Sequence, residues 1–159
     1  LEFVLAPDYE TKKTYSANVT ASDGINTTTQ AITVNVKNLN DIAPTFTSSE
    51  SFSAPENQKS IGTITATDAE GDSFTFTVSG DELSITEAGV LTFVTAPDYE
   101  TKTSYSATVT VSDGVNSTQQ DIIVAVTNIN DVAPEFTSEA SFSAAENQTA
   151  IGTVNATDQ

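Results

Sequence analysis

The sequence predicts an all-β chain made of small sandwiches, in which two β-sheets close over one core. Several short segments alternate strictly between apolar and polar residues, as strands do when they bury one face. Val, Ile, Thr and Phe fill these segments, and Gly- and Asp-rich stretches separate them. A third observation is an internal repeat of 90 residues, which is the length of a whole small domain rather than of a solenoid unit.

The repeat extends through most of the chain. Residues 1–69 align with residues 91–159 without a gap, and 45 of these 69 positions are identical. The segment APDYETK at 6–12, for example, returns at 96–102. We therefore expect a stretch of a tandem array in which each small domain is one bead.

The first half of one repeat is expected to contain three strands. Two short candidates lie at 45–53 and 61–66. The third candidate, SFTFTVS at 73–79, alternates strictly and ends before Gly80. Its apolar face consists of Phe74, Phe76 and Val78.

The second half is expected to contain four strands. Short candidates lie at 83–86 and 90–95 and are separated by Gly89, and longer ones lie at 105–111 and 121–127. The apolar faces of the longer pair consist of Tyr105, Ala107, Val109 and Val111, and of Ile122, Val124 and Val126. Seven short antiparallel strands, each with one apolar face, predict two sheets packed as a β-sandwich.

The charge of the chain excludes several kinds of partner. Five Lys oppose 22 acidic residues, there is no Arg, and the formal net charge is −17. Nucleic acid is not expected as a partner, because phosphate contacts need clustered Lys and Arg. An anionic membrane surface is disfavoured for the same reason, and no apolar run reaches the ~18 residues of a membrane helix, so direct membrane insertion is not expected. Such a surface suits metal cations, or simply solubility in salty water.

The missing residue types argue against an enzyme. The chain has no His or Cys, so the common pairs of nucleophile and base cannot form, and neither can a disulfide or a thiol zinc site. A hydrolase with two carboxylates stays formally possible. However, the acidic residues recur with the repeat, and a unique active site has no reason to recur. We therefore predict a protein without catalytic activity.

Two nearly identical acidic heptapeptides stand one repeat apart. NLNDIAP occupies 38–44 and NINDVAP occupies 128–134. Calcium binds six to eight oxygens from carboxylates, amides and backbone carbonyls, and these heptapeptides supply such groups. The plain alternative is a turn rich in Asn and Asp.

Five acidic motifs together resemble those of cadherin repeats. NINDVAP at 128–134 resembles the cadherin linker D-x-N-D-N-x-P, and PDYE at 97–100 resembles L-D-R-E. PEN at 55–57 matches P-E-N, DAE at 68–70 resembles D-x-D, and VSD at 111–113 resembles A-x-D. The order of the motifs is that of the family. The Thr-rich, Cys-free composition is similar to that of bacterial cadherin-like repeats in giant surface adhesins.

The resemblance implies a fold and a division of the chain. It implies tandem seven-stranded Greek-key β-sandwiches in a linear array, with calcium bound between successive domains. Residues 1–41 would be the C-terminal part of one repeat, residues 44–131 a complete repeat, and residues 134–159 the N-terminal part of the next. Asp98, Glu100, Asn130 and Asp131 are expected at one end of the complete repeat, and Asp68 and Glu70 at the other.

The resemblance also implies a ligand set for Ca²⁺ at each junction. The first set is Asp8, Glu10, Asn38, Asn40 and Asp41 from below, with Asp68, Glu70 and Asp113 from above. The second set is Glu56, Asp98 and Glu100 from the lower repeat, Asn128, Asn130 and Asp131 from the linker, and Asp158 from the next repeat. We expect two or three calcium ions per junction. Affinity should be lowered at one site, because Asn replaces the first Asp of the cadherin linker at 38 and 128.

The expected function is that of an extracellular spacer. Calcium would stiffen the repeats into a rod within a secreted, tandem-repeat bacterial surface adhesin or a surface fibre. The expected partners are neighbouring repeats of the same chain, calcium, and like domains in a fibre. Two alternatives stay open: a polysaccharide-binding module attached to a secreted hydrolase, which would need an exposed aromatic platform, and adhesion between like domains.

Overall fold

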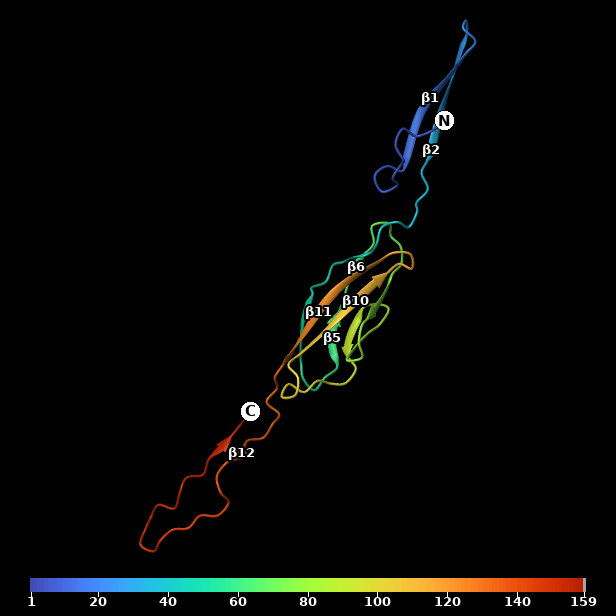
Figure 1. Ribbon diagram of the computed structural model, residues 1–159. Coiled ribbons are helices and arrows are strands. Elements are labelled where there is room, and N and C mark those ends of the chain that lie inside the picture. The colour runs from blue at the N-terminus through green and yellow to red at the C-terminus, as the bar shows by residue number, and fades with distance from the viewer. Residues whose placement is uncertain (159) are drawn as a thin grey trace.

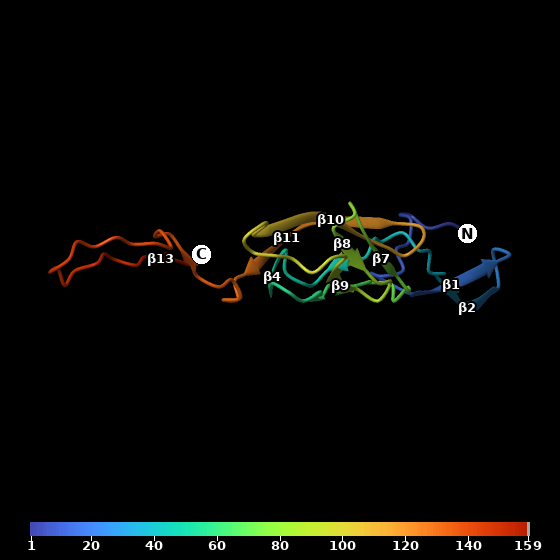
Figure 2. The same cartoon turned by 90° about the horizontal axis from the view of Figure 1, so that it is seen from below.

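The computed structural model describes residues 1–158, and in this part of the chain it contains strands β1 to β13 and no helix (Figure 1). The molecule is elongated. The hairpin β1–β2 lies at one end, a β-sandwich lies in the middle, and the pair β12–β13 lies at the other end, in both views (Figure 2). No helix among these residues is long and apolar enough to cross a membrane.

The larger sheet of the sandwich has four strands in the order β4-β11-β10-β7. These strands are β4 (Ser51–Pro55), β11 (Ser117–Thr127), β10 (Ser104–Ser112) and β7 (Thr75–Val78). β10 is antiparallel to both of its neighbours, whereas β4 runs parallel to β11. The edge strands β4 and β7 are short, which limits their pairing with other chains.

The opposite layer is built from shorter strands. β5 (Ser60–Thr63), β9 (Val90–Phe93) and β8 (Leu83–Ile85) form an antiparallel sheet with β9 in the centre. β3 (Thr45–Phe46) and β6 (Ala66–Thr67) form a separate antiparallel pair. The two layers face each other across a single core.

The core is made by the inward faces of the two sheets. Leu91 and Phe93 of β9 are buried, and they belong to one cluster with the buried Val109 and Val124 of the other sheet. The Phe93 ring packs edge to face against the Tyr105 ring, with 5.0 Å between the centroids. The alternation along β10 and β11 therefore points the predicted apolar faces inward.

Gly89, which joins β8 to β9, is fixed by a close backbone approach. Its carbonyl accepts a hydrogen bond of 2.8 Å from the backbone N–H of Ile64, and its φ is +87°. A Cβ at this position would lie 2.2 Å from the Ile64 carbonyl oxygen. Only glycine fits here without moving the backbone.

The segments on either side of the sandwich form strand pairs, but their side chains are less buried than those of the sandwich. β1 (Thr14–Ser22) and β2 (Thr27–Asn35) form an antiparallel hairpin, and β12 (Glu135–Phe136) pairs with β13 (Ala156–Thr157). Val19 is 44% exposed, whereas Val109, its counterpart one repeat later, is 0% exposed. The same strand pattern thus reaches full burial only where both sheets are present.

The all-β sandwich class is confirmed, but three details differ from the sequence-based expectation. The segment 45–53 is two strands, because β3 pairs with β6 whereas β4 crosses to the other sheet and pairs with β11. The prediction that all strands would be antiparallel is therefore wrong for the pair β4 and β11. The segment 61–66 is also interrupted, because β5 ends at Thr63.

Candidate metal centres

Three groups of carboxylates gather where the sandwich meets its linkers. In each group the oxygens lie within 4.8 Å of one another. The groups are Glu10, Asp41 and Glu70; Asp68, Glu70 and Asp72; and Glu56, Asp98 and Glu100. The first two groups share Glu70 and lie at the β1–β2 end of the sandwich, whereas the third lies at the β12–β13 end (Figure 1).

The turn after β6 shapes the site at the first end. Oδ1 of Asp68 accepts hydrogen bonds from the backbone N–H groups of Glu70 (2.8 Å), Gly71 (2.9 Å) and Asp72 (3.2 Å). Gly71 has a φ of +84°, which lets the chain turn back tightly. The turn therefore directs three carboxylates, those of Asp68, Glu70 and Asp72, toward one point.

Glu70 connects this turn to the linker that precedes the sandwich. Its Oε2 accepts hydrogen bonds from the backbone N–H groups of Asp41 (2.9 Å) and Ile42 (2.8 Å). Its Oε1, like Oδ2 of Asp68, is buried and has no hydrogen-bond partner. Buried carboxylate oxygens are rarely left without a donor or a cation, because their desolvation is costly. The carboxylate oxygens of this turn therefore fit a hard cation such as calcium.

Glu56 organises the opposite end of the sandwich. It is only 1% exposed. Its Oε2 accepts a hydrogen bond of 2.7 Å from the backbone N–H of Tyr99, and its Oε1 accepts one of 2.7 Å from the backbone N–H of Ile129. One buried carboxylate thus joins the PDYE turn to the linker that follows β11.

The side chains around Glu56 extend this connection. Oδ2 of Asp98 accepts a hydrogen bond of 2.8 Å from the Thr101 hydroxyl, and Oδ1 accepts one of 3.1 Å from the backbone N–H of Glu100. Glu100 in turn accepts a hydrogen bond of 3.2 Å from Nδ2 of Asn128. Nδ2 of Asn57 donates to Oδ2 of Asp131. The linker is therefore held by several groups of the sandwich below it.

The pKa shifts divide the acidic residues into two kinds. The hydrogen bond from the Thr101 hydroxyl lowers the pKa of Asp98, and Thr11 does the same for Asp8. Desolvation, a contact with Asp8 and repulsion from Glu70 raise the pKa of Glu10. In Glu100, a hydrogen bond from the backbone N–H of the same residue favours the charged carboxylate. Desolvation and repulsion from Glu56 and Asp131 outweigh this bond, so that the pKa of Glu100 is raised. Crowded like charges of this kind are relieved by a bound cation.

The predicted ligands of the first junction fall into three groups. Glu10, Asp41, Asp68 and Glu70 meet in the clusters, and Asp8 supports Glu10 by accepting a 3.1 Å hydrogen bond from its backbone N–H. Asn40 and Asp113 meet beside these clusters. Burial acts to raise the pKa of Asp113, but hydrogen bonds from Asn116, Val115 and Asn40 outweigh it and lower this pKa. Asn38 is an exposed linker residue.

The predicted ligands of the second junction are brought together less completely. Glu56, Asp98 and Glu100 form one cluster, and Asn128 and Asp131 contact its rim through Glu100 and Asn57. Asn130 is an exposed linker residue, and Asp158 follows directly after β13. Asp158 does not belong to any of the acidic clusters among residues 1–158.

Three functional residues were missed by the reasoning from sequence. Asp72 completes the second cluster, Asn57 binds Asp131, and Asn116 binds Asn40. Asp72 could have been found as the third acidic residue of DAEGD. The signal for the two Asn residues is their return one repeat away, as Asn147 and Asn26.

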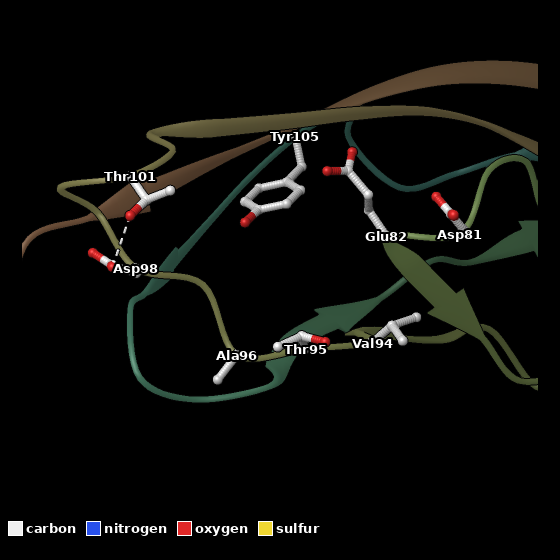
Figure 3. A pocket seen from close by; sticks show the side chains of 8 residues that line it. All are labelled: Asp81, Glu82, Val94, Thr95, Ala96, Asp98, Thr101 and Tyr105. Atoms are coloured by element: carbon white, nitrogen blue, oxygen red, sulfur yellow. Dashed lines mark hydrogen bonds between the residues drawn. The ribbon is translucent and has the colours of Figure 1, made fainter.

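A hollow of about 380 Å³ lies beside Asp98, on the flank of the sandwich (Figure 3). The Tyr105 ring points into it between Thr101 and Glu82 (Figure 3). The ammonium of Lys102 lies 4.3 Å from the centre of this ring and is paired with Glu82. Within the sandwich, the aromatic residues are buried or half-buried: Phe46, Phe52, Phe74, Phe76, Phe93, Tyr99 and Tyr105. They do not form an exposed platform for sugars.

Comparison with known proteins gives consistent matches. A profile described as "Bacterial Ig domain" matches residues 40–127. Protocadherin gamma-A2 of Homo sapiens is 32% identical over 165 residues, which cover 92% of this chain and 18% of that protein. The fat-like cadherin-related tumor suppressor homolog of Drosophila melanogaster is 33% identical over 147 residues, which cover 84% of this chain and 3% of that protein. The chain thus spans less than a fifth of these relatives.

Solved structures of cadherin domains share the fold. The protocadherin gammaB4 extracellular domain is 25% identical and matches 97% of this chain and 28% of its own, with a TM-score of 0.75. The protocadherin gammaB7 EC3-6 cis-dimer structure is 24% identical and matches 84% of this chain and 38% of its own, with a TM-score of 0.73.

Proposed function

Because this chain belongs to the bacterial Ig domain family and folds as a cadherin-like repeat, we propose that it is an extracellular spacer stiffened by calcium at its junctions. In this proposal, residues 1–41, 44–131 and 134–159 belong to three consecutive repeats. The parent protein would be a tandem-repeat bacterial surface adhesin or surface fibre. The reported relatives are named as cadherins rather than enzymes, which favours a mechanical role.

The observation that carries the proposal is the composition of the first cluster. Glu10 comes from the segment before β1, Asp41 from the linker, and Glu70 from the turn after β6. A cation held by these three carboxylates would bind both repeats and the linker at once. The two buried oxygens without a partner, Oδ2 of Asp68 and Oε1 of Glu70, lie in this region and support such a cation.

The proposed sites take two or three Ca²⁺ per junction. At the first junction, Glu10, Asp41, Asp68 and Glu70 would hold metal together with Asp72, and Asn38, Asn40 and Asp113 would complete the shell. At the second junction, Glu56, Asp98 and Glu100 would act with Asn128, Asn130, Asp131 and Asp158. Calcium would supply charge and bonds to several oxygens at once, and the chain would supply the ligands and their spacing.

Electrostatics explains why the metal would stiffen the chain. Residues 42–131 carry 13 acidic residues and two Lys, so one repeat has a net charge of −11. Carboxylates held within about 5 Å of one another repel, although the surrounding water screens part of this repulsion. Without metal this repulsion acts across the junction, between Glu10 and Glu70. Bound calcium replaces it with attraction, so that a flexible joint becomes a stiff one.

Association of like domains is a second candidate function. One similar structure, that of protocadherin gammaB7, is described as a cis-dimer. In this chain, Ile123 on the outer face of β11 is 58% exposed. This role is compatible with a spacer, because a fibre brings like repeats side by side. The polysaccharide-binding alternative receives no support from the covered aromatic residues of the sandwich.

Calorimetric titration with Ca²⁺ tests the proposal, and Glu70→Gln is the informative variant. The wild type should show saturable binding, and Glu70→Gln should lose affinity at the first junction because it removes a charged ligand shared by two clusters. Glu87→Gln is a matched control, since Glu87 is an exposed acid in the turn between β8 and β9. No binding by the wild type, or equal losses in both variants, would contradict the proposal.

A further inference from the structure

The turn between β10 and β11 contacts the linker that precedes the sandwich. Nδ2 of Asn116 donates a hydrogen bond of 2.7 Å to Oδ1 of Asn40 and a longer one of 3.3 Å to the Asn40 carbonyl oxygen. Both residues are half-buried. A residue late in the sandwich, 76 positions further along the chain, therefore holds the segment that leads into it.

The Asn116 side chain is presented by a rigid turn. Oδ1 of Asp113 accepts hydrogen bonds from the backbone N–H groups of Val115 (2.7 Å) and Asn116 (2.6 Å). The Ser112 hydroxyl donates to the Asn116 carbonyl at 2.9 Å and accepts a hydrogen bond from the backbone N–H of Gly114 at 3.1 Å. The turn is thus fixed by its own residues before it meets the linker.

The first hairpin contains the same turn, and among residues 1–158 the Asn side chain of this turn bonds only within the turn itself. Oδ1 of Asp23 accepts hydrogen bonds from the backbone N–H groups of Ile25 (2.9 Å) and Asn26 (2.7 Å). Asn26 is exposed, and its Nδ2 lies 3.3 Å from Oδ2 of Asp23. Since the Asp carboxylate accepts the same two backbone hydrogen bonds in both turns, the contact of the Asn side chain with the linker is additional to them.

This contact differs in kind from the other contacts of the linker. Glu70 also holds the linker, but its carboxylate lies among Glu10 and Asp41 and is repelled by them. The bond between Asn116 and Asn40 joins two neutral amides, so the repulsion that follows loss of metal does not weaken it directly. Asn40 also precedes Asp41, a member of the first carboxylate cluster.

We propose that Asn116 is a positioning residue for the linker. It holds Asn40 against the sandwich in the absence of metal and thereby keeps Asp41 close to Glu10 and Glu70. Calcium then meets a site that is already partly assembled, so that less conformational freedom is lost on binding. The effect on calcium affinity rests on the proposed function, whereas the ordering of the linker does not.

The ordering is tested by NMR relaxation of the backbone amides of Leu39 and Asn40 in EDTA. The wild type should have order parameters close to those of the sandwich, and Asn116→Ala should lower them toward those of a flexible segment, below about 0.6. Asn26→Ala, the same change in the same turn one repeat earlier, should leave them unchanged. Asn40→Ala removes the acceptor of the same hydrogen bond and should lower the order parameter of Leu39 equally. It replaces Asn116→Ala in the test if that variant does not fold.

Calcium affinity provides the second readout. The net contribution of one hydrogen bond predicts that Asn116→Ala weakens calcium binding by between about twofold and tenfold. Asn26→Ala should bind calcium as the wild type does. A linker that is equally ordered in the wild type and Asn116→Ala in EDTA would overturn the proposal, and so would a loosened linker with unchanged affinity. If the wild type binds no calcium, the proposed function fails, and relaxation in EDTA still decides the role of Asn116.

Discussion

At the scale of single residues, the acidic motifs acquire distinct tasks. Glu56 is buried and holds backbone N–H groups of the PDYE turn and of the linker. In Asp68, Oδ1 accepts hydrogen bonds that shape the turn, whereas Oδ2 has no hydrogen-bond partner. Asp98 forms its own turn and has a lowered pKa. The acidic motifs are similar in composition, but their residues differ in role. Some carboxylates stabilise turns and linkers, and others have oxygens that could bind a cation.

Sequence reasoning identified most of these residues because acids and amides in turns recur with the repeat. Asp72 was within its reach as the third acidic residue of DAEGD, whereas Asn57 and Asn116 escaped it for a physical reason. Their roles depend on contacts between segments that are far apart in the chain, such as the 76 positions between Asn40 and Asn116. Such contacts cannot be deduced from local spacing.

The raised pKa values of Glu10 and Glu100 predict how calcium binding depends on pH. Both values lie above the ordinary 4.5, so these carboxyls take up protons first as the pH falls. Affinity should therefore decrease as the pH falls from neutrality toward 4.5, because protons compete with the cation. Asp98, whose pKa is lowered, should stay ionised over this range.

Titration calorimetry at both ends of this pH range measures this effect. Without calcium, the stability of the folded state should depend on pH in the opposite direction to calcium affinity. A raised folded-state pKa contributes stability that is present at low pH and lost as the pH rises through this pKa. The metal-free junction should then become less strained on acidification. An affinity that does not change with pH would show that Glu10 and Glu100 are not ligands.

At the scale of elements, the strand pattern was predictable and the pairing was not. The alternation of β7, β10 and β11 could be read from the sequence, because period-two burial leaves a local signature. The change of sheet between β3 and β4 leaves no such signature. It is determined by which strands are available on each side of the core.

The repeat provides a matched pair of positions for testing the core. Val109→Ala should destabilise the sandwich by about 2 kcal/mol, because it removes two buried methyl groups and leaves a cavity. Val19→Ala, at the equivalent position of β1, should change the free energy of unfolding by no more than about 0.5 kcal/mol, because Val19 is 44% exposed. Chemical denaturation followed by circular dichroism measures both. Equal losses would mean that β1–β2 is buried as deeply as β10–β11.

At the scale of the whole molecule, the chain is an elongated series of similar units joined by acidic linkers (Figure 1). Each linker is held by hydrogen bonds from a neighbouring sandwich, through Glu70 and Asn116 at one end and through Glu56 and Asn57 at the other. At the first junction, the carboxylates of successive units, those of Glu10 and Glu70, lie close together. In the proposed function, the direction of the chain at such a junction depends on whether a bound cation relieves the repulsion between them.

Small-angle X-ray scattering from four consecutive repeats, with calcium and with EGTA, tests the central claim most directly. Calcium sites in extracellular modules have Kd values of roughly 10⁻⁴–10⁻³ M, so millimolar calcium should occupy the junctions and give a stiff, extended particle. EGTA should reduce the average and maximum dimensions while each sandwich stays folded, and Asp131→Ala should reproduce this loss at one junction. A maximum dimension that is the same in calcium and in EGTA would contradict the account.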